Sequence, residues 1–93
     1  MAQRTVTIGS AVGLHARPAS LFVRAATATG LHVTIARDGA DTAHPVDADS
    51  ILAVMGLGAR HGERVVLRAD GDGADDALDR LAALLSQDLD HAE

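Results

Sequence analysis

Residues 13–28, GLHARPASLFVRAATA, contain the most informative pattern in the chain. It places His15 directly before a segment that is typical of a helix start, because Pro18 fits the first turn, where its missing N–H costs nothing. The first turn of a helix leaves backbone N–H groups without partners and carries partial positive charge, so it attracts anions. An imidazole beside these amides and the guanidinium of Arg17 is suited to forming and holding a phosphohistidine.

The helix that follows His15 is expected over residues 16–28, with two separate faces. The core face has the i, i+3, i+4, i+7 spacing and consists of Ala19, Phe22, Val23 and Ala26. The second face consists of Arg17, Leu21 and Arg24, flanked by Ser20. Leu21 is expected to be exposed in this basic setting, and Gly30 to end the helix as its C-terminal cap.

Residues 5–8 alternate between polar and apolar and predict a half-buried strand, and further strands are expected at residues 32–36, roughly 40–46, and 65–69. Asp38-Gly39 predicts a tight hairpin between the second and third strands. Pro45 lacks a hydrogen-bond donor for the ladder, so the third strand should lie at a sheet edge.

Two further helices are expected after the third strand. Ser50 is suited to capping a short helix at residues 51–55 that Gly56 and Gly58 end. The last helix follows a turn at residues 70–73. Its first turn contains Asp75 and Asp76, and its buried stripe contains Leu78, Leu81, Leu85 and Leu89, helped by Ala82.

This order, β-α-β-β-α-β-α, predicts an α+β open-faced β-sandwich in which three helices cover one face of a four-stranded antiparallel sheet. We expect residues 1–93 to form a single domain. Hydrophobic residues make up 47% of the chain and Phe22 is its one aromatic residue, so the core must be mainly aliphatic.

Composition also excludes several function classes. A net charge of −5 and a single aromatic side chain argue against nucleic-acid binding through phosphates or stacked bases. The chain has no cysteine, which excludes disulfides, thiol catalysis and thiolate metal sites. The first residues lack the apolar stretch of a signal peptide and no run reaches membrane-spanning length, so we expect a cytoplasmic protein with no direct membrane insertion.

Residues 13–20, GLHARPAS, resemble the active-site signature of HPr, the phosphocarrier family of the bacterial phosphoenolpyruvate:sugar phosphotransferase system. Residues 50–58, SILAVMGLG, resemble the serine-led second signature of the same family. The resemblance implies that enzyme I phosphorylates His15 on Nδ1 and that IIA domains of sugar transporters receive the group. Arg17 would stabilise the phosphoryl oxygens together with the backbone of Ala16 and Arg17. The resemblance implies a carrier with no cofactor or metal of its own, rather than an independent enzyme.

The resemblance also implies a surface that docks successive partners. The matching positions in this chain are Ser20, Leu21, Arg24, Ile51, Leu52 and Met55. An adaptable apolar patch with a basic rim suits a surface that binds several acidic partners and releases them. Transient docking of this kind favours a monomer.

Ser50 has two interpretations, which can both hold. It is suited to being the N-cap of the short helix, and the family resemblance adds a regulatory phosphorylation site for an HPr kinase. Asp49 stands where many family members carry lysine or another polar residue, and its charge opposes an added phosphate. Val12 replaces a polar residue common in the family, so an auxiliary hydrogen bond near His15 is expected to be missing.

Two alternatives keep the same fold. One is a paralogous phosphocarrier of a regulatory, nitrogen-type branch, which keeps the histidine motif. The other is a regulatory binding module that acts through Ser50 and the 51–55 surface and is indifferent to His15. A ligand-sensing domain has no support, because nothing in the chain indicates a pocket. The other histidines, His32, His44, His61 and His91, lack metal-ligand spacing, and residues 70–76 lack the pattern of a calcium loop.

Overall fold

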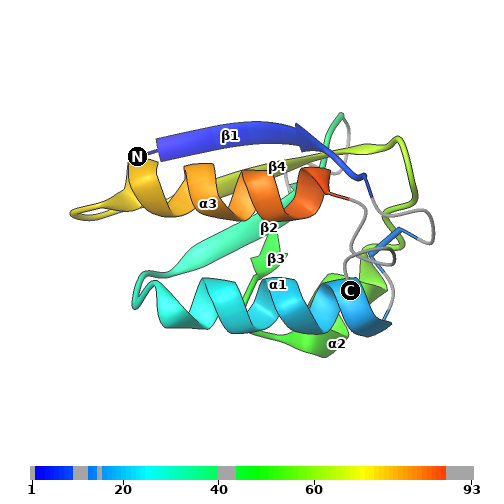
Figure 1. The fold of residues 1–93 in the computed structure, drawn as a ribbon, viewed down its shortest axis with the longest axis horizontal. Helices are drawn as coiled ribbons and strands as arrows, with labels where there is room; N and C mark the ends of the chain where they lie inside the picture. The colour runs from blue at the N-terminus through cyan, green and yellow to red at the C-terminus, as the bar shows by residue number, and fades with distance from the viewer. Residues whose placement is uncertain (1, 10–12, 15, 40–43, 88–93) are drawn as a thin grey trace.

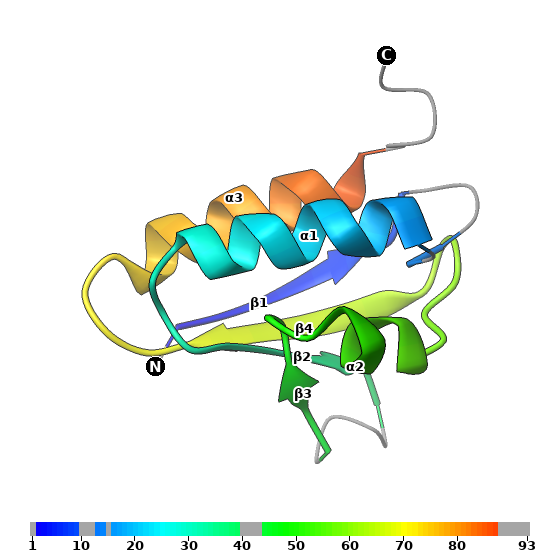
Figure 2. The same ribbon diagram turned by 90° about the horizontal axis from the view of Figure 1, so that it is seen from below.

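The computed structural model describes residues 2–9, 13–14, 16–39 and 44–87, and within them the chain forms a four-stranded sheet and three helices. The elements are β1 (Ala2–Thr7), α1 (Ala16–Ala28), β2 (Val33–Arg37), β3 (Val46–Asp47), α2 (Ile51–Gly56), β4 (Arg64–Ala69) and α3 (Ala74–Ser86). The strand order is β1-β4-β2-β3, and every neighbouring pair is antiparallel. The helices lie on one face of the sheet (Figures 1 and 2), which confirms the expected open-faced α+β architecture.

The two central strands show how alternation builds the core. Val65 and Leu67 of β4 and Ile35 of β2 are fully buried beneath the helices. Thr34 and Arg68 are paired across the sheet and alternate with these core residues, so they face away from the helices. One face of the sheet therefore belongs to the aliphatic core. The other carries Thr34 and Arg68 together with the small buried pair of Ala36 and Val66.

The helix α1 begins and ends where the sequence predicts. Ala19, Phe22 and Ala26 of the expected core face are buried, and Val23 packs against the core from a partly exposed position. Gly30 adopts a φ of 71°, and its N–H donates to the carbonyl of Thr27 at 3.2 Å. A residue with a β-carbon is strained in this left-handed conformation, so glycine is favoured here.

The predicted third strand exists, but its predicted bounds of roughly 40–46 were wrong at His44 and Pro45. The strand β3 contains Val46 and Asp47 alone; residues 40–43 lie outside the described part of the chain, and His44 and Pro45 are not in a strand. Proline has no N–H for the ladder, which limits the strand on that side. Its place at the sheet edge is confirmed by the strand order.

The predicted tight hairpin at Asp38-Gly39 was also wrong. Ile35 pairs with Val46, so the connection between the two strands is longer than a two-residue turn allows. The Asp38 N–H donates to the carbonyl of Arg64 at 3.0 Å, so Asp38 continues along β4 instead of turning. The N–H of Gly39 is bonded to the Asp38 carboxylate at 3.0 Å.

Other boundaries differ slightly from expectation. Strand β1 covers Ala2–Thr7 instead of residues 5–8, because six consecutive residues pair with β4. Ile8 follows the strand and is nevertheless buried. In α3 the expected stripe of Leu78, Leu81 and Leu85 is buried, whereas Leu89 lies outside the described residues. Among the described residues, no helix has the length and apolar character needed to cross a membrane.

The chain after β1 approaches the end of α3 closely enough to require a glycine. The Gly9 N–H donates to the carbonyl of Leu85 at 2.9 Å, and a β-carbon on Gly9 would lie 2.0 Å from the carbonyl oxygen of Ser86. Both groups belong to the backbone, so the clash cannot be relieved by rotating a side chain. Any larger residue at position 9 must push α3 away from the sheet.

We predict that Gly9→Ala lowers the free energy of unfolding by about 1–3 kcal/mol, the usual cost of overpacking. The matched control is Gly56→Ala, because Gly56 is helical and has open space around the added β-carbon. That control should leave stability unchanged or raise it by about 0.5–1 kcal/mol, since alanine favours a helix. Urea unfolding followed by circular dichroism measures both, and equal effects of the two substitutions would contradict the close-approach argument.

Candidate functional site

The N-terminal end of α1 is the candidate site, and its electrostatics differ from those of α3. The first turn of α3 contains Asp75 and Asp76, which neutralise the positive end of that helix. The first turn of α1 contains no acidic residue and includes the exposed side chain of Arg17. The start of α1 therefore keeps its attraction for an anion.

The start of α1 is also held firmly by its packing. Pro18 lies in the first turn with its ring fully buried, and Ala19 beside it is fully buried as well. Ala16 and Arg17 are exposed at the end of the helix. The first residues of a helix have N–H groups with no partner inside the helix, and this is the position at which helices commonly bind anions.

His15 itself, and Val12 before it, lie outside the described residues. The residues on both sides of His15 are described: Leu14 is buried in the core and Ala16 begins α1. The roles predicted for His15 and for the missing hydrogen bond at Val12 therefore stay predictions.

The segment of residues 59–63 lies against the chain just before His15. The Leu14 N–H donates to the carbonyl of Ala59 at 2.9 Å. Gly13 has a φ of 75°, and a β-carbon there would lie 2.5 Å from the same carbonyl oxygen and 2.8 Å from the Cα of Arg60. Glycine is therefore required at position 13 both by its left-handed backbone and by the close approach of this segment.

The sequence patterns did not predict that residues 59–63 contact the chain before His15. Ala59 is buried in the core, whereas Arg60 is exposed beside Gly13. The signal that could have found this segment was the pair Gly58 and Gly62, which encloses three residues between the second family-like motif and β4. Periodicity does not reveal which loop such a segment contacts, because the contact is long-range.

Glu63 joins this segment to the sheet through both carboxylate oxygens. Its Oε1 accepts the Arg60 backbone N–H at 2.7 Å, and its Oε2 accepts from the Arg37 guanidinium at 2.7 Å. The hydrogen bond from the Arg60 amide, aided by the charge of Arg37, holds the pKa of the Glu63 carboxyl below its ordinary value despite partial desolvation.

The six residues expected to dock partners lie on two helices that pack against each other. In both ribbon views α2 lies beside the N-terminal part of α1 (Figures 1 and 2). On α2, Leu52 is 81% exposed and Ile51 is 38% exposed, while Met55 is half-buried against the core. On α1, Arg24 is exposed and Ser20 is half-buried. Leu21 is half-buried too, which corrects the expectation of an exposed leucine.

Ser50 caps α2 as the sequence predicts. It has an extended backbone, with φ −111° and ψ 111°, and its Oγ accepts the Ala53 N–H at 3.3 Å. This satisfies one of the unpaired donors of the helix. The Ser50 side chain is half-buried, next to the exposed Ile51 and Leu52.

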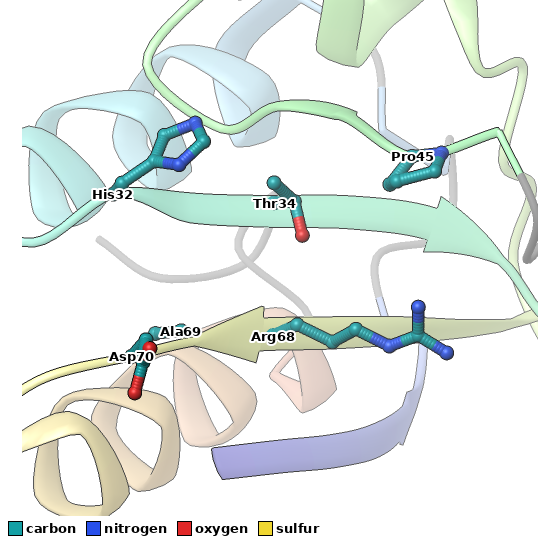
Figure 3. Close-up of a pocket in the computed structure, with 6 residues that line it drawn as sticks. All are labelled: His32, Thr34, Pro45, Arg68, Ala69 and Asp70. Atoms are coloured by element: carbon teal, nitrogen blue, oxygen red, sulfur yellow. The ribbon is translucent and has the colours of Figure 1, made fainter. Parts of the chain in front are cut away.

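A hollow on the uncovered face of the sheet lies away from this site. Its volume is about 290 Å³, and it is lined by His32, Thr34, Pro45, Arg68, Ala69 and Asp70 (Figure 3). None of these lining residues belongs to α1 or α2. His32 there forms an exposed contact with Asp47 at 2.7 Å, as expected for a histidine with a solvent-facing role. Among the described residues, no group of three histidine, aspartate or glutamate side chains could hold a metal ion.

Comparison with known proteins gives one consistent family. Residues 2–87 match the family model for the HPr component phosphorylation site of the phosphotransferase system. A phosphocarrier protein HPr from Streptomyces coelicolor is 59% identical over 91 residues, which cover 97% of this chain and 94% of that protein.

Solved structures agree with that family. A phosphocarrier protein HPr from Bacillus anthracis superposes with a TM-score of 0.81 at 34% identity, covering 90% of this chain and 95% of that one. A structure of an HPr dimer from Thermoanaerobacter tengcongensis has a TM-score of 0.64 at 37% identity, covering 90% of this chain and 92% of that one.

The lowered pKa of Glu63 gives stability a specific pH dependence. The unfolded chain takes up this proton near the ordinary pKa of 4.5, whereas the folded chain takes it up at lower pH. The stabilisation that the Glu63 carboxylate contributes is therefore complete above about pH 5.5. It is lost as the pH falls through the pKa that Glu63 has in the folded protein. We predict that the stability difference between the parent and Glu63→Gln narrows over this range. Urea unfolding at several pH values measures it, and a difference that stays constant down to about pH 3 would contradict the assignment.

Proposed function

We propose that this chain, which belongs to the HPr family of phosphocarrier proteins, accepts a phosphoryl group on His15 from phospho-enzyme I and passes it to IIA domains of sugar transporters. Its place in the phosphotransferase system and its nature as a carrier rather than an enzyme follow from the family. The proposal adds the residue, the partners and the direction of transfer. The observation that carries it is the start of α1, whose positive end no acidic residue in its first turn neutralises.

The chemistry requires one nucleophile and a set of anion donors. The neutral Nδ1 of His15 attacks phosphorus, a P–N bond forms, and the bond from phosphorus to enzyme I breaks with its electron pair staying on enzyme I. The positive helix end disfavours the imidazolium, which keeps the ring nitrogen able to attack. Arg17 and the amides of Ala16 and Arg17 then stabilise the phosphoryl oxygens. The same steps in reverse deliver the group to the acceptor.

Partner docking is proposed for the surface formed by Ser20, Leu21, Arg24, Ile51, Leu52 and Met55. The exposed Leu52 and Ile51 supply apolar area, and the exposed Arg24 supplies positive charge for acidic partners. Leu21 and Met55 contribute from half-buried positions at the junction of α1 and α2. We also propose that the protein is a monomer and is located in the cytoplasm. Because a relative has been solved as an HPr dimer, the oligomeric state should be measured directly, by sedimentation.

A regulatory use of Ser50 is kept as a second, narrower proposal. A phosphate on Ser50 would place about two negative charges next to Ile51 and Leu52 and so weaken docking of acidic partners. The cap geometry supports this, because the Ser50 side chain is only half-buried. Asp49 opposes it by placing a like charge beside the same hydroxyl.

The central test is labelling with enzyme I, phosphoenolpyruvate and magnesium. We predict that the parent protein acquires an acid-labile phosphate and that His15→Ala acquires none, because the attacking nitrogen is gone. His32→Ala is the matched control, since it removes an exposed histidine elsewhere and should label like the parent. Circular dichroism verifies that both variants fold. Parental labelling of His15→Ala would refute the assignment of the carrier nitrogen.

The docking proposal is tested at its most exposed apolar residue. We predict that Leu52→Ala raises the KM for this protein in the enzyme I reaction by about 5- to 10-fold, since a hot-spot side chain contributes more than about 1 kcal/mol to an interface. Its free energy of unfolding should change by less than about 0.5 kcal/mol, because the side chain is 81% exposed. An unchanged KM would exclude Leu52 from the docking surface.

A further inference from the structure

Ile8 and Leu14, at the two ends of the chain that leads to His15, are both hydrogen-bonded to the segment of residues 59–63. The Ile8 N–H donates to the carbonyl of Glu63 at 2.8 Å and the Ile8 carbonyl accepts from Gly62 at 2.9 Å. The Leu14 N–H donates to the carbonyl of Ala59 at 2.9 Å. The position of residues 59–63 therefore sets where the chain enters His15.

The shape of this segment depends on Glu63. The Glu63 N–H donates to the Arg60 carbonyl at 3.0 Å, while its Oε1 accepts the Arg60 N–H at 2.7 Å, so both backbone groups of Arg60 are bonded to one residue. The second oxygen is bonded to Arg37 of β2 at 2.7 Å, which anchors the turn to the sheet. Arg64, next in the chain, pairs with Asp38 instead, at 3.4 Å, so it does not compete for this carboxylate.

We infer that Glu63 is a positioning residue for phosphoryl transfer at His15, acting through the turn at residues 60–63 and the Ala59 carbonyl on Leu14. This inference rests on the proposed transfer at His15. The side chain of Glu63 is 35% exposed and contributes little to the apolar core, so its role is to hold the turn. A small displacement of the Ala59 carbonyl moves Leu14, the residue that precedes His15, relative to the start of α1.

The test compares Glu63→Ala with Glu63→Gln in the enzyme I reaction. Glu63→Ala leaves the Arg60 N–H without its acceptor, and we expect kcat to fall about 10-fold with an unchanged KM, because the docking surface is intact. Glu63→Gln keeps an acceptor oxygen for that N–H and should recover most of the parental kcat. A residue with a merely structural role would not show the split between kcat and KM.

The second readout is hydrogen exchange at the Leu14 amide, which reports the bond to Ala59 directly and needs no activity. It should exchange about 10-fold faster in Glu63→Ala than in the parent, while the Gly9 amide, bonded to Leu85, should keep its rate. Asp79→Ala is the matched control, because it removes the exposed ion pair with Arg4 at 2.8 Å. It should leave kcat and Leu14 exchange unchanged.

Different results would contradict the positioning role of Glu63 and the carrier function of His15. Parental kcat and parental Leu14 exchange in Glu63→Ala would overturn the positioning role while leaving the carrier function intact. A parent protein that acquires no phosphate on His15 would overturn the proposed function, and the assignment of Glu63 to transfer would fall with it. An equal loss of kcat in Asp79→Ala would show a general stability effect and would also overturn the inference.

Discussion

The hydrogen bond from the Leu14 N–H to the carbonyl of Ala59 is the interaction on which the site depends. It joins the chain before α1 to the chain after α2, two segments more than forty residues apart in the sequence. Gly13 allows the approach, because any β-carbon there would meet the same carbonyl. This contact and the packing of α1 against α2 bring the two family-like motifs close together.

The acidic residues of this chain leave the first turn of α1 without negative charge. The net charge is −5, yet the first turn of α1 has no carboxylate and includes Arg17. Acidic residues gather instead on α3, where Asp75 and Asp79 bind Arg4 of β1 at 3.2 and 2.8 Å. These exposed ion pairs contribute little to stability. They hold these carboxylates on α3 and not at the helix end that would receive a phosphoryl group.

The core shows how a chain with one aromatic residue supports this arrangement. Phe22 is fully buried from α1, and aliphatic side chains from the sheet and α3 fill the space around it. Pro18 and Ala19 are buried in the same layer, which holds the first turn of α1 rigidly. Leu52 stays outside this layer, with its side chain 81% exposed.

The helices, strands β1, β2 and β4 and the first turn of α1 without acidic residues were predictable from the chain alone, because they depend on local spacing, caps and periodicity. The sequence identified Ser50 as a cap and Phe22 as core for the same reason. The sequence predicted the wrong bounds for the third strand and a tight turn at Asp38-Gly39 that does not form. The hydrogen bond from the Asp38 N–H to the Arg64 carbonyl and the pairing of Ile35 with Val46 override the local turn preference there. Only the tertiary structure decided the role of residues 59–63 and Glu63. Their contacts with Ile8, Leu14 and Arg37 join segments far apart in the chain, and no local pattern encodes such contacts.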